Sequence, residues 1–487
     1  MNQEGQNHDA EATVVGLFGS QPVAAARPTL PRGGTPRVQH PDRQQVVLRC
    51  AALDEQLPED HPVRQVWAYA TTVDCASWYG QIQAVEGGAG RPPIDPQILL
   101  ALWLYATLDG VGSARELARL CDLHKVYEWI CGGVGVNHST LSAFRTRNVE
   151  FLDQLLTDSV AGLLHEGLVT LHRVAQDGVR VRASAGAASF RREATLQECQ
   201  AEAQAQVQQL RAELEADPGA ASARQRAAKE RAARERTQRL HQAVAAAQQL
   251  AAQRPAPKPA STPAPAPEDR DRGPGAGGGT QAPKPPPAPR VSTTDPEARV
   301  MKMPDGGYRP AFNVQFATAT GSRIITGVAV GNCGSDQGQL GPMVAQHQQR
   351  YGRRPQEMLV DGGYAKKADI AQVSAPEVGV TVYAPVQQPK KAGQDRYARR
   401  ADDGDEVADW RARMGTEPAQ RIYKERAATA ECTNAQARNR GLRQFLVRGL
   451  AKVRAVALWF ALAHNLMRAV ALRAARQAGG ARRAAVA

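Results

Sequence analysis

The sequence predicts an α/β protein with a mixed sheet, preceded by an all-α region and interrupted by a helical and Pro-rich insert. Residues 55–165 show helical periodicity with capping residues at the expected places. From residue 167 onward, short alternating apolar runs are separated by helical segments, which is typical of an α/β fold. Residues 193–254 are rich in Ala, Gln, Glu and Arg, and residues 255–290 form a Pro/Gly/Ala tract, so an insert divides the sheet in sequence.

The helical region is expected to span residues 46–166 and to bind DNA. The segment PPIDPQILLALWLYATLDG places proline ahead of an apolar stripe, and Ser113-Ala-Arg-Glu116 is a capping box. Asn137 is a cap former at the start of a further helix that carries Arg145 and Arg147. Short helices joined by Gly-containing turns favour a helix-turn-helix cluster, while an all-α packing domain without DNA contacts is the alternative.

The first part of the sheet is expected within residues 167–192. LVTLHRVAQDGVRVRAS predicts a strand over Leu168–Ala175, a turn at Asp177-Gly178 and a second extended piece. The rest of the core is expected over residues 291–476 and opens with a hairpin, whose strands are predicted at Ala311–Thr318 and Arg323–Gly331.

Later in the chain, EMLVDGG predicts a buried strand ending at Asp361, and residues 379–386 predict another strand. Residues 387–418 are predicted to be a loop, and the chain beyond is predicted to be helical. The insert is expected to be a helical hairpin or coiled coil over 193–254 and a linker over 255–290. Residues 1–45 and 477–487 are expected to be a disordered leader and tail.

The charge of the chain indicates an anionic partner. The net charge is +13, and residues 421–487 alone carry 14 Lys and Arg against two acids. This composition suits a phosphate backbone, so DNA is the expected partner. The seven cysteines include no C-x-x-C pair, and residues 1–13 have no signal-peptide pattern, so we expect a cytoplasmic, nucleoid-associated protein that does not enter a membrane.

Three acids are candidate metal ligands. Asp177 and Asp361 each follow an apolar run and precede a glycine, and Glu431 is a minority charge in a basic helix. The alternative interpretation makes the aspartates turn formers and Glu431 a surface ion-pair partner. If the three converge, their mutual repulsion calls for cations, and oxygen ligands suit two Mg²⁺ or Mn²⁺ ions that act on a phosphodiester.

Several segments in this order resemble the DDE transposases of bacterial insertion sequences. They are HSTLSAFR after RPPIDPQILLALWLY, then QDGVRVRA, FNVQFA, MLVDGGYAKK and YKERAATAE, followed by RGLRQFLVRGLAKVRAVALWFALAHNLMR. The resemblance covers roughly residues 90–185 and 291–470. It implies an RNase H-like core, a helical domain that recognises terminal inverted repeats, and transposition by two-metal phosphoryl transfer.

The resemblance also implies roles for individual residues. Asp177, Asp361 and Glu431 match the catalytic, metal-binding acids. Other matching or nearby basic and aromatic residues are expected to contact DNA: Tyr423, Arg426, Arg438, Arg443 and Arg448, with Arg145 and Arg147 from the helical domain. Asn313 and Gln315 match a polar pair on the middle strand that binds substrate or braces the sheet.

Two departures from the family pattern are visible. The gap from Arg426 to Glu431 is one residue longer than in the best-known form of the motif, which leaves the helical register of Glu431 open and Glu425 as a weaker substitute. The insert is unusually placed, between the first strand and the central hairpin, and is interpreted either as an arm for dimerisation or as a passive linker.

The leading functional hypothesis is a transposase that acts on two ends as a homodimer. The alternatives are a metal-dependent nuclease without strand transfer and an inactive or repurposed DNA-binding protein. A ribosome- or RNA-binding protein is a further alternative, against which the lack of RNA-recognition aromatics counts.

Overall fold

The computed structural model describes residues 50–85, 92–216, 222–253, 288–389 and 393–486, together with two short strands near the N-terminus. The chain divides into two compact units, Met1–Ala52 and Leu53–Ala487. In the first unit, β1 (Val14–Gly16) and β2 (Gly19–Gln21) form an antiparallel pair inside the segment expected to be a disordered leader. The rest of that leader lies outside the described residues, as does most of the predicted 255–290 linker.

The described residues of the second unit begin with a short 3₁₀ helix, Leu53–Gln56, and seven α-helices, in agreement with the predicted all-α character of this region. They are α1 (Pro62–Thr72), α2 (Ala76–Tyr79), α3 (Pro96–Leu108), α4 (Ala114–Leu123), α5 (Lys125–Cys131), α6 (His138–Arg147) and α7 (Val149–His165). Both predicted N-caps are present, since Ser113 Oγ accepts from the Glu116 backbone N–H and Asn137 Oδ1 accepts from that of Thr140. The predicted capping box is only half formed, because the Glu116 side chain pairs with Arg119. Most apolar residues of α3 are buried, Leu100 and Trp103 fully, and they form the centre of this helical layer.

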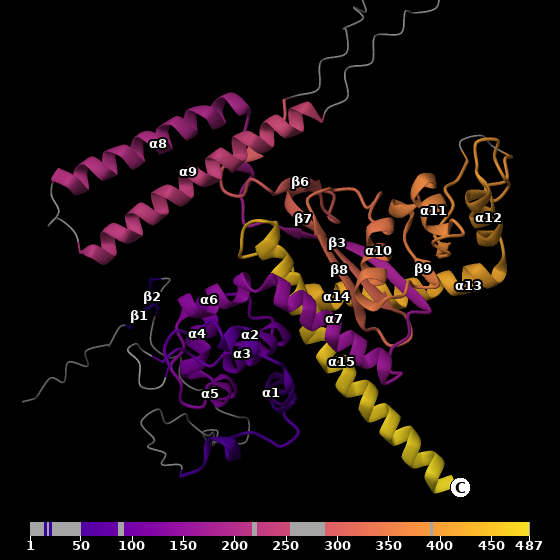
Figure 1. Ribbon diagram of the computed structural model, residues 1–487, viewed down its shortest axis with the longest axis horizontal. Coiled ribbons are helices and arrows are strands. Elements are labelled where there is room, and N and C mark those ends of the chain that lie inside the picture. Colours follow the sequence, from indigo (N-terminus) through magenta and orange to yellow (C-terminus); the bar gives the residue numbers. More distant parts are fainter. Residues whose placement is uncertain are drawn as a thin grey trace, which may run out of the picture. The chain divides into compact units, whose positions relative to one another are not determined.

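A mixed sheet follows, as the sequence predicts (Figure 1). Its strands are β10 (Thr381–Tyr383), β9 (Glu357–Leu359), β3 (Arg173–Arg182), β7 (Tyr308–Ala319) and β6 (Arg299–Lys302) in that order, and β8 (Ile325–Gly331) also pairs with β7. The pairs β10–β9 and β9–β3 are parallel, whereas β7 is antiparallel to β3, β6 and β8. The central strand β3 therefore joins the parallel and the antiparallel parts of the sheet.

The predicted turn at Asp177-Gly178 is wrong, because both residues lie inside the continuous strand β3. Asp177 is opposite Phe316 and Gly178 is opposite Gln315 in the antiparallel ladder with β7. An Asp-Gly pair favours turns locally, but pairing with β7 satisfies the backbone of this strand across the predicted break.

The insert forms an antiparallel pair of helices, α8 (Glu193–Ala216) and α9 (Ala223–Ala252), which lie side by side in Figure 1. The chain leaves and re-enters the core through the paired strands β4 (Phe190–Arg191) and β5 (Val291–Ser292). Leu196 on α8, Ala243 and Ala247 on α9, and Val291 on β5 share a small buried cluster at this base. Residues 217–221, between the two helices, lie outside the described residues.

The helices after β8 are α10 (Leu340–Tyr351), α11 (Lys367–Ser374), α12 (Asp405–Met414), α13 (Glu417–Arg426), α14 (Cys432–Asn439) and α15 (Leu450–Val486). Residues 427–431, between α13 and α14, form a π-helical turn. Helix α12 lies within the segment predicted to be a loop, and α15 runs through the predicted disordered tail. The loop prediction rested on polar composition, which does not exclude a helix with one packed face.

Helix α15 joins the helical layer to the sheet. It contacts α3, α6 and α7 on one side and β8 on the other, and Leu458, Trp459 and Phe460 are buried in the shared core. Within the described residues, α15 is long and apolar enough over Leu450–Gly479 to span a membrane, but 72% of its apolar window is buried inside the protein. This burial is what a core helix requires.

Candidate active site

Asp177 and Asp361 extend from neighbouring parallel strands at equivalent positions. The β3–β9 ladder ends with Ala175 opposite Leu359, and each aspartate lies two residues further along its strand direction. Asp361 is also the cap of a short 3₁₀ turn, and its Oδ1 accepts a hydrogen bond from the Gly363 N–H at 2.8 Å. The Asx-turn interpretation of Asp361 is thus correct locally, and the same carboxylate faces the site described next.

The guanidinium of Arg426 lies among the three predicted acids. Its Nη2 is 3.2 Å from Asp177 Oδ2 and 3.9 Å from Asp361 Oδ2, and its Nη1 is 3.6 Å from Glu431 Oε1. Asp177 from β3, Asp361 from the loop after β9 and Glu431 from the α13–α14 segment therefore surround the Arg426 guanidinium. The alternative acid Glu425 instead pairs with Arg173.

The π-helical turn explains how Glu431 reaches this cluster. A π-helical turn contains about one residue more than an α-helical turn, so side chains five residues apart lie on the same face. The turn at residues 427–431 accommodates the additional residue between Arg426 and Glu431 and keeps their side chains in contact. Glu431 is the most accessible of the three acids, with 65% of its side chain exposed.

Asp177 is the most buried acid of the cluster, and burial raises its pKa to about 6. Arg426 opposes this increase, whereas the nearby carboxylates of Asp361 and Asp336 add to it. Asp177 Oδ2 also accepts a hydrogen bond from Asn434 Nδ2 at 3.0 Å, which ties β3 to α14. A buried carboxylate with several like charges nearby is expected to bind cations when it is ionised.

The oxygen ligands fit a hard divalent ion, but Arg426 is positioned between them. In this conformation, no group of three or more His, Cys, Asp and Glu side chains among the described residues is close enough to hold a metal ion. Two buried amide oxygens nearby, Asn313 Oδ1 and Asn434 Oδ1, accept no hydrogen bond from the described residues. Unpaired buried acceptors are costly, so they fit a site that takes up a cation or its water ligands.

The other residues predicted to contact DNA differ in their exposure. Tyr423 is half-buried beside Arg426, and burial raises its pKa. Arg438, Arg443 and Arg448 are exposed. The segment that carries Arg443 is fixed to the sheet, because the Arg182 N–H donates to the Arg443 carbonyl and the Phe445 N–H donates to the Arg182 carbonyl.

Arg145 was expected to contact DNA, but the structure buries its side chain. Arg145 is 9% exposed, its Nη1 donates to the Gly112 carbonyl, and its guanidinium lies 4.5 Å from the ring centre of Trp103. Burial lowers the pKa of Arg145 to about 10. A side chain enclosed in this way braces the helical layer, because its charged group is not available to a DNA backbone.

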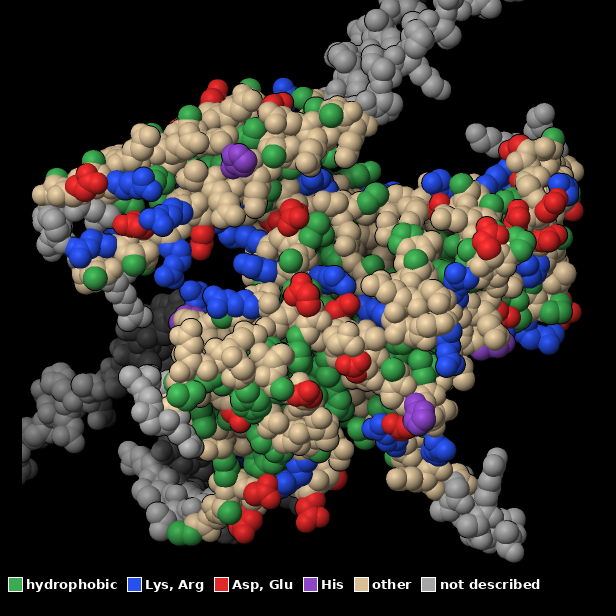
Figure 2. Space-filling view, viewed as in Figure 1, with side chains coloured by type: hydrophobic (Ala, Val, Ile, Leu, Met, Phe, Trp, Pro, Cys, Tyr) green, Lys and Arg blue, Asp and Glu red, His purple; other side chains and the backbone are tan. Residues whose placement is uncertain are grey.

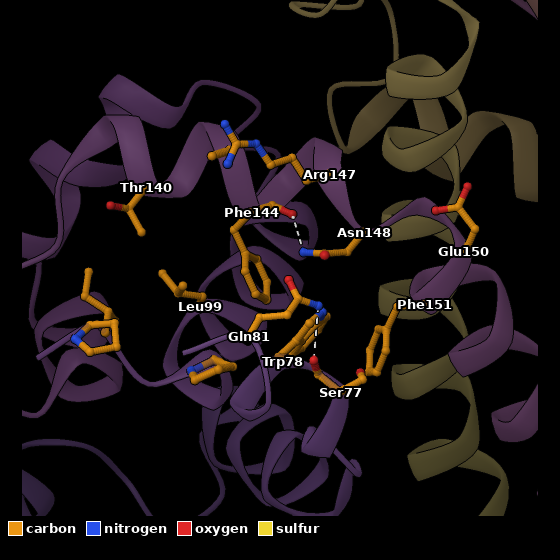
Figure 3. Close-up of a pocket in the computed structure, with 14 residues that line it drawn as sticks. Ser77, Trp78, Gln81, Leu99, Thr140, Phe144, Arg147, Asn148, Glu150 and Phe151 are labelled. Carbon is orange, nitrogen blue, oxygen red and sulfur yellow. Dashed lines mark hydrogen bonds between the residues drawn. The ribbon is translucent and has the colours of Figure 1, made fainter. Parts of the chain in front are cut away.

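Arg147, two residues further along α6, is exposed at the edge of a pocket. The pocket has a volume of about 690 Å³ and lies between α2, α3, α6 and the start of α7. Figure 3 shows Arg147 on one side of it and the aromatic side chains of Trp78 and Phe151 on the other. Arg147 remains a candidate DNA contact on a face that Thr140 also lines.

Sequence reasoning identified the three acids around Arg426 but missed Asp336. Asp336 lies in the loop before α10, with 13% of its side chain exposed, and influences the pKa of both Asp177 and Tyr364. Its signal in the sequence is indirect. Gly178 directly follows Asp177, and in the structure a side chain at this position would collide with the Asp336 carboxylate.

Comparison with known protein families finds two matches. Residues 51–147 match a transposase domain (DUF772), and residues 387–470 match a transposase DDE domain. The second match contains Arg426 and Glu431, whereas Asp177 and Asp361 lie outside both. No curated protein and no solved structure matches the chain. The two matches confirm the family resemblance that the sequence motifs indicated.

Proposed function

We propose that this chain is a DDE transposase of an insertion sequence. It would cut the DNA at both ends of its element and join the element ends to target DNA. The observation that carries this proposal is the convergence of Asp177, Asp361 and Glu431 around the Arg426 guanidinium. The mixed sheet, with β3 between a parallel and an antiparallel neighbour, supports an RNase H-like core.

The three carboxylates would hold two Mg²⁺ or Mn²⁺ ions. When bound, such ions activate a water or 3′-hydroxyl and stabilise the leaving oxygen of a phosphodiester. Arg426 neutralises the acids in the metal-free protein and would pair with a DNA phosphate when it leaves them. Tyr423, next to Arg426, would flank the same phosphate.

Exposed arginines would hold the DNA against this site. Arg438 lies in the last turn of α14, and Arg443 and Arg448 lie in the segment between α14 and α15. Arg448 Nε donates to the Ser184 carbonyl just beyond β3. We assign recognition of the inverted repeats to the helical domain of residues 46–166, with Arg147 as a contact. Because two ends must be held together, we propose a homodimer as the working form.

The proposal is tested by incubating the full chain with the DNA that flanks its own gene, with and without Mg²⁺, and mapping breaks and joined products. Asp361→Asn should abolish Mg²⁺-dependent cutting and leave DNA binding nearly intact. Asp305→Asn is the matched control, since Asp305 is exposed and paired with Arg309. Cutting by Asp361→Asn at the wild-type rate would contradict the proposal, and breaks without joined products would indicate a nuclease.

A further inference from the structure

Asp336 is a carboxylate at the candidate active site, with 13% of its side chain exposed, that the three-acid motif does not include. It lies in the loop between β8 and α10 and comes over the face of the sheet where β3 and β7 pair. Its Oδ1 accepts hydrogen bonds from Asn313 Nδ2 at 2.7 Å and Gln315 Nε2 at 2.8 Å, and its Oδ2 is 3.6 Å from Arg180 Nη2. These contacts fix the orientation of the carboxylate.

Gly178 leaves space for Asp336. A Cβ on Gly178 would lie 2.5 Å from Asp336 Oδ1, which no side chain could tolerate without displacing the carboxylate. A Cβ on Gly363 would lie 3.5 Å from Asp336 Oδ2 and 2.9 Å from Asp361 Oδ1. Gly178 therefore permits a close approach of Asp336 to the part of β3 that carries Asp177, whereas Gly363 lies at ordinary contact distance from Asp336.

A second observation indicates that this corner takes up a ligand. Asn313 is 2% exposed, and its Oδ1 accepts no hydrogen bond from the described residues. This oxygen lies next to Gly178, 2.8 Å from where a Cβ on that residue would be. An amide oxygen buried without a donor costs free energy unless a water or cation fills the gap. A water held by a metal ion is a strong donor and would satisfy both this oxygen and Asp336.

We propose that Asp336 is a positioning carboxylate of the active site, which together with Asn313 Oδ1 accepts hydrogen bonds from the water ligands of a divalent ion held by Asp177 and Asp361. This inference rests on the proposed function. Asp336 adds negative charge to the site and orients the metal-bound waters, while Asn313 and Gln315 keep its carboxylate in place. Mutation of residues that hydrogen-bond to metal ligands, without binding the metal themselves, typically lowers metal affinity 10- to 100-fold.

The test measures Mn²⁺ binding to the full chain without DNA, by electron paramagnetic resonance titration of free Mn²⁺. Asp336→Asn should weaken Mn²⁺ binding by about 10- to 100-fold in a metal-free protein that still unfolds cooperatively, since the amide oxygen can keep accepting from Asn313 and Gln315. Asp305→Asn, at an exposed acid, should bind as the wild type does. Affinity of Asp336→Asn within twofold of the wild type would overturn the proposal.

A charge-swap variant keeps the test decisive if Asp336→Asn folds poorly. In Asp336→Asn/Asn313→Asp the amide and the carboxylate exchange places, so the hydrogen bond and the local charge are both retained. Mn²⁺ affinity should return to within about threefold of the wild type, whereas a value as low as that of Asp336→Asn overturns the positioning role. Asp177→Asn separates this inference from the proposed function: if it binds Mn²⁺ like the wild type, the proposed metal site itself is wrong.

Discussion

Arg426 and Glu431 are five residues apart in the chain, and their side chains meet across a π-helical turn with Arg426 Nη1 3.6 Å from Glu431 Oε1. The turn takes up one additional residue without rotating α14 away from the sheet. Asn434, on the following helix, still reaches Asp177. The insertion in the motif is thus absorbed within a single turn.

Deletion of Ala428 should convert this π turn into an α-helical turn and preserve the site. Arg426 and the glutamate would then be four residues apart, which again places them on one face. We expect a change in the free energy of unfolding of no more than about 1 kcal/mol and retention of cleavage. Deletion of Gln436, inside the regular helix α14, is the control and should abolish both folding and cleavage; equal effects of the two deletions would contradict this account.

Replacement of Arg426 by alanine should destabilise the metal-free protein. Arg426 and Asp177 have side chains that are 11% and 15% exposed, so removing the guanidinium leaves a buried carboxylate without its cation, at a cost of about 3 kcal/mol. Mg²⁺ at about a hundredfold its dissociation constant should restore about 2.7 kcal/mol. Urea unfolding with and without Mg²⁺ measures both effects.

Arg421→Ala is the matched control for that experiment. Its ion pair with Glu417 is exposed, so the loss should stay below about 1 kcal/mol and should not respond to Mg²⁺. A metal-free Arg426→Ala protein as stable as Arg421→Ala would show that the guanidinium does not neutralise the acids.

Arg145 and Arg147 should behave differently although they share α6. Arg145→Ala removes a buried side chain that packs on Trp103, and it should lower the free energy of unfolding by about 2 to 3 kcal/mol. Arg147→Ala should leave stability unchanged and reduce the slope of log affinity against log salt by about 0.9 if it contacts one phosphate. Chemical unfolding and salt titration of inverted-repeat binding separate the two roles.

Arg443 and Arg448 should contribute to DNA affinity mainly through phosphate contacts. Replacing both by alanine should lower the salt slope by about 1.8, since each contact contributes about 0.9. Arg353→Ala, at an exposed arginine in the loop before β9, is the control and should leave the slope unchanged. An unchanged slope in the double variant would place both arginines away from the DNA.

His347 should make the protein less stable as the pH falls from 6.5 to 4. Burial lowers the pKa of His347 to about 4, so the unfolded chain binds a proton in this interval that the folded protein excludes. At pH 4.5 the loss relative to pH 7 should be about 2 to 3 kcal/mol greater in the wild type than in His347→Gln. The exposed His138 provides the control: His138→Gln should follow the wild type at both pH values.

Local rules in the sequence predicted the helical layer and the later strands. Ser113 and Asn137 cap helices where their side chains can reach free N–H groups, and that property depends only on neighbouring residues. The same local rule failed at Asp177-Gly178, because long-range pairing with β7 determines the conformation there. Polar composition likewise failed to distinguish α12 from a loop, since one packed face is enough for a helix.

The site residues that belong to the family motif could be predicted from the sequence. Those whose exposure or position depends on tertiary packing could not. Asp177, Asp361, Glu431 and Arg426 could be matched to a pattern. Arg145 could not be recognised as a buried brace, because exposure depends on how α6 packs against Trp103. Asp336 is 159 residues from Asp177 in the chain, and only the folded sheet shows that Gly178 makes room for it.

The central position of α15 has a consequence for synthesis of the protein on the ribosome. Helices α3 and α7 have been synthesised once residue 165 has left the ribosome, but α15, which packs on their apolar faces, begins only at residue 450. At 5 to 20 residues per second, the nascent chain carries these faces uncovered for roughly 15 to 60 seconds. Newly made molecules would therefore require chaperone protection during that interval, and a chain truncated before α15 would retain an adhesive surface and be directed to degradation.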